Sequence, residues 1–185
     1  MRIEKSFRAD QDVILHFLDV LGGGAANLSG NKKARPGFFI FAHTFIQEFV
    51  EDNFFKKEEL LVKALENNGF PLDDGPVGSM RAEQGKSRAA AAHLLNASKG
   101  WQAGDEEARV EVGWAASEYT SAMRQHLNRM KNLIFPLLDQ NISPDDEHKI
   151  SEGLNAIAFE TGVEGDTTKY IKLIESLEDE LGEWR

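Results

Sequence analysis

The sequence predicts an all-α protein, an up-down four-helix bundle with two additional C-terminal helices. Apolar residues recur every three or four positions along almost the whole chain, and no stretch shows the sustained alternation of a half-buried strand. Four of these amphipathic stretches are long, and short links at most junctions favour antiparallel neighbours. A chain of 185 residues is enough for one well-buried domain, so we expect a single domain with its core bundle at about 6–138 and its C-terminal helices at about 143–182.

The first two long helices are expected on either side of a glycine-rich connection. The first begins near Ser6, and residues 22–36 are expected to form a flexible link because they are rich in glycine and other turn formers. The second runs from about Pro36, a favoured first-turn residue, to Asn67, where the sequence NNGFP supplies a glycine and then a proline that end a helix.

The other two long helices are expected at about residues 75–99 and 105–138. Pro76 suits the first turn of the third helix. Asp105 is a candidate cap for the fourth helix, and the acidic residues that follow suit the positive end of a helix dipole.

Two shorter helices are expected to close the chain. Ser143 can cap the first of them, with Pro144 at its first helical position. The second is expected from about Asp166 to Leu181. Both are amphipathic, so we expect them to pack against one side of the bundle.

Composition excludes several classes of function. The formal net charge of −10 argues against binding to nucleic acid or to anionic membranes, because phosphate groups select basic surfaces. Without cysteine the chain has no disulfide, thiolate metal ligand or cysteine nucleophile. The N-terminal stretch MRIEKSFRADQDVI lacks the pattern of a signal peptide, and the apolar runs are too short to span a bilayer. We therefore expect a cytoplasmic protein, either a monomer or a homodimer.

Each long helix carries a polar residue within its apolar stripe. In the fourth helix the stripe steps by threes and fours through Val112, Ala116, Tyr119, Met123, His126, Met130, Leu133 and Leu137. The polar residues of the four stripes are, in chain order, Gln11, Glu58, Gln84 and His126. His43 and Gln47 share the stripe of Glu58.

A buried carboxylate costs several kcal/mol unless it is paired. We therefore expect the four polar residues, one from each long helix, to meet inside the bundle. The alternative is that one or two stripes are rotated and that these groups reach solvent at a helix edge.

Two stretches of the chain match motifs of a known family. The first is FVEDNFFKKEELLVKALENNGFPLDDGPVGSMRAEQGKSR, residues 49–88, which resembles the patterns F-x-x-x-x-H-H-x-K-E-E-x-x-L, G-P-x-G-x-M and E-H-x-x-G-R. It departs from them at the histidines, which are Phe54, Phe55 and Gln84 here, and at the glycine of the third pattern, which is Ser87. The second is HLNRMKNLIFPLL, residues 126–138, which is similar to H-x-x-K-E-N-x-x-L-F-P. In these motifs the chain resembles the bacterial hemerythrin-like proteins, the HHE cation-binding domain family. The resemblance covers nearly the whole chain.

The resemblance implies a four-helix bundle around a non-haem di-iron centre, which histidines and bridging carboxylates from all four helices hold in that family. The six positions that correspond to the family's ligands hold Gln11, Phe54, Glu58, Gln84, His126 and Met130. Only Glu58 and His126 are of the ligand type. The resemblance therefore implies that most of the iron ligands have been replaced.

Two strong ligands are too few for an iron pair, and even zinc normally takes three or four. Glutamine keeps the hydrogen-bonding capacity of an imidazole, and Gln11, Gln84 and His126 are all able to donate to a carboxylate. We therefore expect a metal-free, hydrogen-bonded polar core with no cofactor. The expected function is that of a non-enzymatic binding or regulatory protein that no longer binds oxygen, with an unknown small molecule or protein as its partner.

Two alternatives remain open. One is a metalloprotein that retains a single cation, non-haem iron or another divalent ion, at Glu58 and His126. The other is an enzyme that uses the same two residues as an acid–base pair in a phenylalanine-lined cavity. The phenylalanines concerned are Phe38, Phe39, Phe41, Phe45, Phe49, Phe54 and Phe55. Nothing in the sequence nominates a substrate, which makes the enzyme the less favoured interpretation.

Overall fold

The structure is a computed structural model that describes residues 2–162 and 167–184. Its elements are α1 (Arg2–Ala26), α2 (Pro36–Phe45), η1 (Ile46–Phe54), α3 (Phe55–Asn67), α4 (Gly75–Gln102), α5 (Ala108–Arg129), η2 (Met130–Ile134), α6 (Phe135–Asn141), α7 (Pro144–Thr161) and α8 (Thr167–Glu183). The two η segments are π-helical, and they join their neighbours into two continuous rods, α2–η1–α3 and α5–η2–α6.

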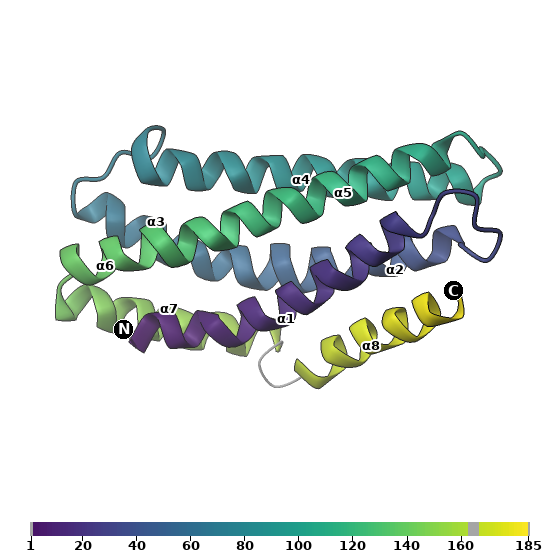
Figure 1. The fold of residues 1–185 in the computed structure, drawn as a ribbon. Coiled ribbons are helices and arrows are strands. Elements are labelled where there is room, and N and C mark those ends of the chain that lie inside the picture. The colour runs from purple at the N-terminus through teal and green to yellow at the C-terminus, as the bar shows by residue number, and fades with distance from the viewer. Residues whose placement is uncertain (1, 163–166, 185) are drawn as a thin grey trace.

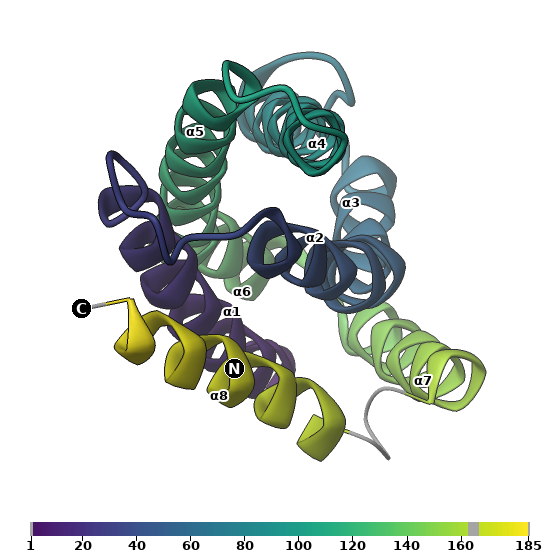
Figure 2. The same cartoon turned by 90° about the vertical axis from the view of Figure 1, so that its right-hand side faces the viewer.

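Four long rods form the bundle (Figure 1). The end view shows α1, α5, α4 and the α2–α3 rod arranged around a common axis (Figure 2). Helix α7 contacts α1, η1 and α3, whereas α8 contacts α1 and α2. The prediction of an all-α, up-down four-helix bundle with two additional C-terminal helices is therefore confirmed, and the described residues contain no strand.

The phenylalanines of the core pack against one another. Phe45 stacks between Phe17 and Phe49, with ring centroids 4.3 Å and 5.0 Å away, and Phe7 meets Phe54 edge to face at 5.9 Å. Such pairs add to the stabilisation that comes from apolar burial alone. Phe41 is the exception in the predicted cluster, because 56% of it is exposed. These contacts give the cluster a packing role.

The glycine-rich stretch after Leu21 is helical, which corrects the prediction of a link over residues 22–36. Helix α1 continues to Ala26. A Cβ atom at Gly23 would lie 2.7 Å from Leu181 of α8, and one at Gly24 would lie 2.5 Å from the ring of Phe38 in α2. The glycines therefore allow two other helices to approach α1 closely, and this role depends on partners distant in sequence.

The π-helical segment η1 corrects the predicted stripe of the second helix. A π-turn contains an extra residue compared with an α-turn, so it rotates everything before it relative to everything after it. The sequence predicts a stripe through Ile40, His43, Gln47, Val50, Phe54, Glu58, Leu61 and Leu65. It is right from Val50 onwards, where all five residues are buried, but upstream of Val50 the buried residues include Ala42, Phe45 and Ile46. His43 is only half-buried and Gln47 is exposed, so neither faces the core as predicted.

Several helix ends also differ from the predictions by a few residues. Helix α1 begins at Arg2 rather than near Ser6, and α5 begins at Ala108 rather than at Asp105. The Asp105 carboxylate does accept a hydrogen bond from the amide of Glu107, at 3.0 Å. The predicted start of the last helix at Asp166 lies outside the described residues.

The start of α7 agrees with the prediction. Ser143 accepts a hydrogen bond from the amide of Asp146, whose carboxylate accepts one from the amide of Ser143. This reciprocal pair satisfies amides that would otherwise lack partners at the helix start. Pro144 occupies the first helical position, where its missing N–H is not needed. Within the parts of the chain that the structure describes, no helix combines the length and the apolarity needed to cross a bilayer.

Candidate functional site

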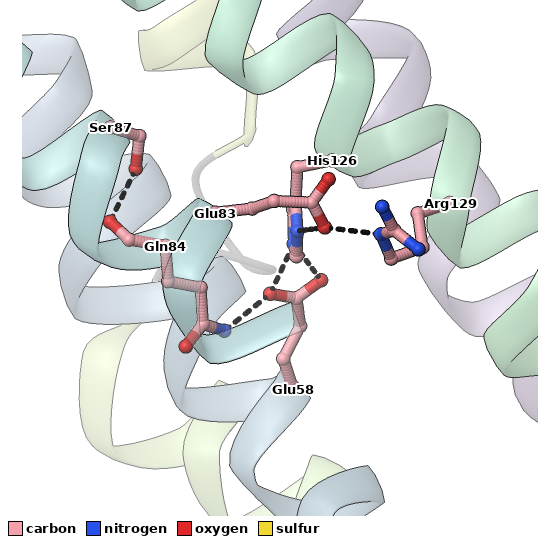
Figure 3. Close-up of polar contacts among 6 residues, drawn as sticks. All are labelled: Glu58, Glu83, Gln84, Ser87, His126 and Arg129. Carbon is pink, nitrogen blue, oxygen red and sulfur yellow. Dashed lines mark hydrogen bonds and ion pairs between the residues drawn. The ribbon is translucent and has the colours of Figure 1, made fainter. Parts of the chain in front are cut away.

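Three of the four predicted polar residues meet in the centre of the bundle. Both carboxylate oxygens of Glu58, on α3, lie 2.8 Å from Nε2 of His126, on α5. Nε2 of Gln84, on α4, donates a hydrogen bond of 2.8 Å to Oε1 of Glu58. All three side chains are buried, and Figure 3 shows them converging from three different helices. The prediction that Glu58, Gln84 and His126 share one site is confirmed.

Two further residues extend this site towards the surface. Oε1 of Glu83 lies 3.7 Å from Nδ1 of His126, which is close enough for an ion pair but too long for a hydrogen bond. The same oxygen accepts a 2.7 Å hydrogen bond from Nε of Arg129, whose side chain is 30% exposed. Figure 3 shows the resulting chain of Glu58, His126, Glu83 and Arg129, which we call the core ion network.

The sequence carries a signal for Arg129 but not for Glu83. Arg129 lies three positions after His126, on the same face of the helix. Glu83 directly precedes Gln84, and adjacent helical residues diverge by about 100°, so helical periodicity places Glu83 off the apolar stripe that contains Gln84. Glu83 is nevertheless buried at 6% exposure, at the boundary between α4 and α5. An arginine on a neighbouring helix makes that burial possible, and sequence periodicity alone does not show such a partner.

The core ion network raises the pKa of His126 from 6.5 to about 9. Burial by itself favours the neutral imidazole, but the charge of Glu58, its hydrogen bond to the ring, and the adjacent Glu83 outweigh burial. His126 is therefore an imidazolium at neutral pH and lies between two carboxylates. Among the described residues, Oε2 of Glu83 and Nδ1 of His126 are buried without a hydrogen-bond partner.

Gln11 does not join this network, which corrects the fourth part of the prediction. It is half-buried, and it lines a surface groove between α1 and α5 together with Leu15 and Asn128. Within residues 2–162 and 167–184 its Nε2 atom is buried and has no hydrogen-bond partner, so it does not donate to Glu58. The neighbouring Asp10 is the polar residue of α1 that is buried instead.

Asp10 belongs to a second buried polar cluster that the sequence analysis missed. Its carboxylate accepts a 2.8 Å hydrogen bond from Nζ of Lys57 and a longer one, 3.4 Å, from Nδ2 of Asn53. The side chain of Lys57 is only 6% exposed and that of Asp10 only 13%. Lysine and aspartate are rarely buried unless they are paired, and the two residues lie on different helices, so only the fold shows the pair.

Replacing Lys57 with methionine tests this second cluster. The methionine fills the volume of the lysine stem but leaves the Asp10 carboxylate nearly buried without its cation, so we expect a loss of about 2 kcal/mol in the free energy of unfolding. Lys56→Met is the matched control, since Lys56 is the adjacent lysine and is exposed. Urea unfolding of both variants gives the comparison, and equal losses would contradict a buried ion pair.

Phe54 and Met130, at the remaining two ligand positions of the family resemblance, are completely buried. Neither offers an oxygen or nitrogen ligand. Over the described ranges of the chain, no group of three or more histidine, aspartate or glutamate side chains is placed to hold a metal ion. Chemically, the site as folded provides a carboxylate and an imidazolium that are held against each other with no exposed surface.

Comparison with known proteins gives one finding about the family. Residues 3–138 match the model of the hemerythrin HHE cation-binding domain. A search of curated proteins and a search of solved structures each found no match. The family match covers the four rods of the bundle, from α1 to the end of η2 and most of α6, and it therefore includes every residue of the core ion network. The chain belongs to the hemerythrin HHE cation-binding domain family.

Proposed function

We propose that this chain is a metal-free member of its family, a non-enzymatic binding or regulatory protein that does not bind oxygen. The observation that carries the proposal is the pairing of Glu58 with His126. Nε2 of His126 lies 2.8 Å from both carboxylate oxygens of Glu58, so the two residues of the ligand type at the family's positions bind each other. Gln84 takes a further acceptor site on the same carboxylate.

The residues present do not fit a di-iron centre. Iron in such a site takes imidazole nitrogens and carboxylate oxygens, and four of the six positions hold residues that offer neither: Gln11, Phe54, Gln84 and Met130. Phe54 packs edge to face against Phe7, so its position is filled by ring contacts. Among the described residues, no other histidine or carboxylate side chains are grouped to replace the four missing ligands. This supports a core without iron.

The core ion network supplies what a cation would otherwise provide. A carboxylate buried in the bundle needs positive charge or hydrogen-bond donors close by. Glu58 receives both from the His126 ring and the Gln84 amide, and Glu83 receives them from His126 and Arg129. Charges of opposite sign alternate along the network. This arrangement supports a structural role for Glu58 and His126, the two residues at ligand positions of the family.

Metal analysis of the native and a restored chain tests the proposal. In the restored variant Phe54→His, Gln84→His and Met130→Glu are combined, which together with Glu58 and His126 gives five ligands on buried positions. We expect protein from iron-supplemented cells to contain iron in the restored variant and no stoichiometric metal in the native chain. Adding Gln11→His is expected to increase iron uptake little, because Gln11 lies in the α1–α5 groove.

Thermal unfolding with and without a chelator provides the control on the native chain. The midpoint should stay unchanged when the chelator is added, since a ligand that binds only the folded state raises the midpoint and its removal lowers it. Stoichiometric metal in the native chain would contradict the proposal. One ion per chain that is lost in Glu58→Gln would instead identify a protein with a single retained cation.

A further inference from the structure

A surface groove lies at the end of the bundle where the α1–α2 connection passes the start of α5, at the right of Figure 1. It has a volume of about 460 Å³, which is within the usual range for small-molecule sites. The lining residues used below are Leu28, Ser29, Arg109, Val110, Trp114 and Ser117. We call it the Trp114 groove.

Arg109 gives this groove an uncompensated positive charge. Arg8, Arg35, Arg81, Arg88, Arg124 and Arg129 each form an ion pair with a carboxylate. Arg109 is the one arginine with a described side chain that has no such partner, although the chain carries 31 acidic residues. Its hydrogen bonds run from Nη2 to the carbonyl oxygens of Leu28 and Asn31, which are uncharged.

The position of the Arg109 guanidinium is held from two sides. The two carbonyl oxygens fix one edge, and the ring of Trp101 lies beneath the plane, with its centroid 5.2 Å from Cζ. A guanidinium carries five N–H donors in a rigid plane. Within the described residues only Nη2 donates to protein acceptors, so the donors on Nε and Nη1 remain for a ligand.

The neighbouring wall of the groove is apolar and open. Trp114 is 66% exposed and Val110, one helical turn earlier, is 54% exposed. Large apolar side chains that stand together at the mouth of a cavity mark a binding surface more often than isolated ones do. The hydroxyl groups of Ser29 and Ser117 add hydrogen-bonding capacity at the rim.

We propose that the Trp114 groove binds a small aromatic carboxylate, with its ring against Trp114 and its carboxylate on the free donors of Arg109. The carboxylate provides the counter-charge that Arg109 lacks, and an arginine can hold it through two parallel hydrogen bonds. A flat ring matches the exposed indole face, since aromatic rings gain from stacking beyond their area burial. This inference rests on the binding role proposed above and gives that role a ligand class.

Calorimetric titration of the 185-residue chain with 2-naphthoate and with the neutral 2-naphthamide tests whether the ligand needs a negative charge to bind at Arg109. The two probes have the same ring system and differ in the group that meets Arg109. We expect naphthoate to bind about tenfold more tightly than the amide, because a charge-assisted hydrogen bond is lost in the second case. Arg109→Gln is expected to remove the difference between the probes.

Replacing Arg109 also removes its hydrogen bonds to the α1–α2 connection. A second variant, which blocks the groove and keeps Arg109, therefore serves as an independent test. A Cβ atom at Gly113 would lie 3.5 Å from Leu28, an ordinary contact, so a side chain can start at this position, and Gly113→Leu adds apolar volume to the lining of the groove. Leucine is a better helix former than glycine, and the variant should therefore fold. We expect it to abolish naphthoate binding, whereas Phe41→Ala, a change at another exposed aromatic residue, should leave the affinity unchanged.

Three results would overturn the inference: no heat of binding with naphthoate, equal affinity for the two probes, or unchanged binding in Gly113→Leu. None of these results bears on the core ion network, which is tested by metal analysis. Failure of the groove and failure of the metal-free core are therefore distinguishable.

Discussion

Replacing His126 with leucine is expected to lower the free energy of unfolding by about 3–5 kcal/mol, because it breaks a buried ion pair on one side only. The leucine fills similar volume, but it leaves the carboxylate of Glu58 completely buried with the Gln84 amide as its remaining hydrogen-bond donor among the described residues. Such a carboxylate must be protonated or hydrated for the fold to persist, and both cost free energy. Urea unfolding at pH 7 provides the measurement.

The double variant Glu58→Met with His126→Leu is the matched control for this prediction. It removes both charges and keeps the core apolar, so it should regain most of the stability that the single change loses, because a buried ion pair gains little over apolar residues of similar size. The comparison isolates the coupling between the two residues. If the double variant is as unstable as the sum of the two single variants, the pair is not coupled.

Stability is expected to fall as the pH rises from 6.5 to above 9. The pKa of His126 is about 9 in the folded chain and 6.5 without the fold, so the imidazolium stabilises the folded state. A raised folded pKa gives a contribution that is complete below pH 6.5 and lost as the pH passes 9. The difference corresponds to about 3 kcal/mol.

Denaturant unfolding at several pH values between 6 and 10 measures this slope. The double variant at positions 58 and 126 is the reference, because it lacks the Glu58–His126 pair and keeps every other residue of the chain. We expect the native chain to lose about 3 kcal/mol relative to the double variant over this range. Parallel pH profiles for the two proteins would show that His126 is not held as an imidazolium.

The parts of the fold that depend on local periodicity and local hydrogen bonds could be predicted from the sequence. The stripe from Val112 on α5 to Met130, the first residue of η2, keeps the α-helical period, and its residues are buried as predicted. The capping pair at Ser143 is likewise local, since both partners lie within four residues. Glu58 and His126 stood out because each interrupts an otherwise apolar stripe, and such a group must find a partner.

The π-helical segments show where local periodicity stops being sufficient. After Met130 the predicted stripe continues through Leu133 and Leu137, which are half-buried, whereas Ile134 and Leu138 are buried. Segment η2 adds a residue to one turn at this point and rotates the rest of the rod. The same effect in η1 moved His43 and Gln47 out of the core. A fixed period of 3.6 residues cannot show such a change in phase.

Which residues distant in sequence come into contact depends on how the helices pack against one another. The pairs Lys57 with Asp10 and Glu83 with Arg129 join different helices, and in each case burial of a charge is tolerated because the other helix supplies its counter-charge. Gln11 stands next to Asp10 in the sequence, yet the rotation of α1 against its neighbours buries the acid and places the amide at a groove. Periodicity in the sequence indicates the apolar face of a helix, and the packing of the neighbouring helices selects which of two adjacent residues enters the core.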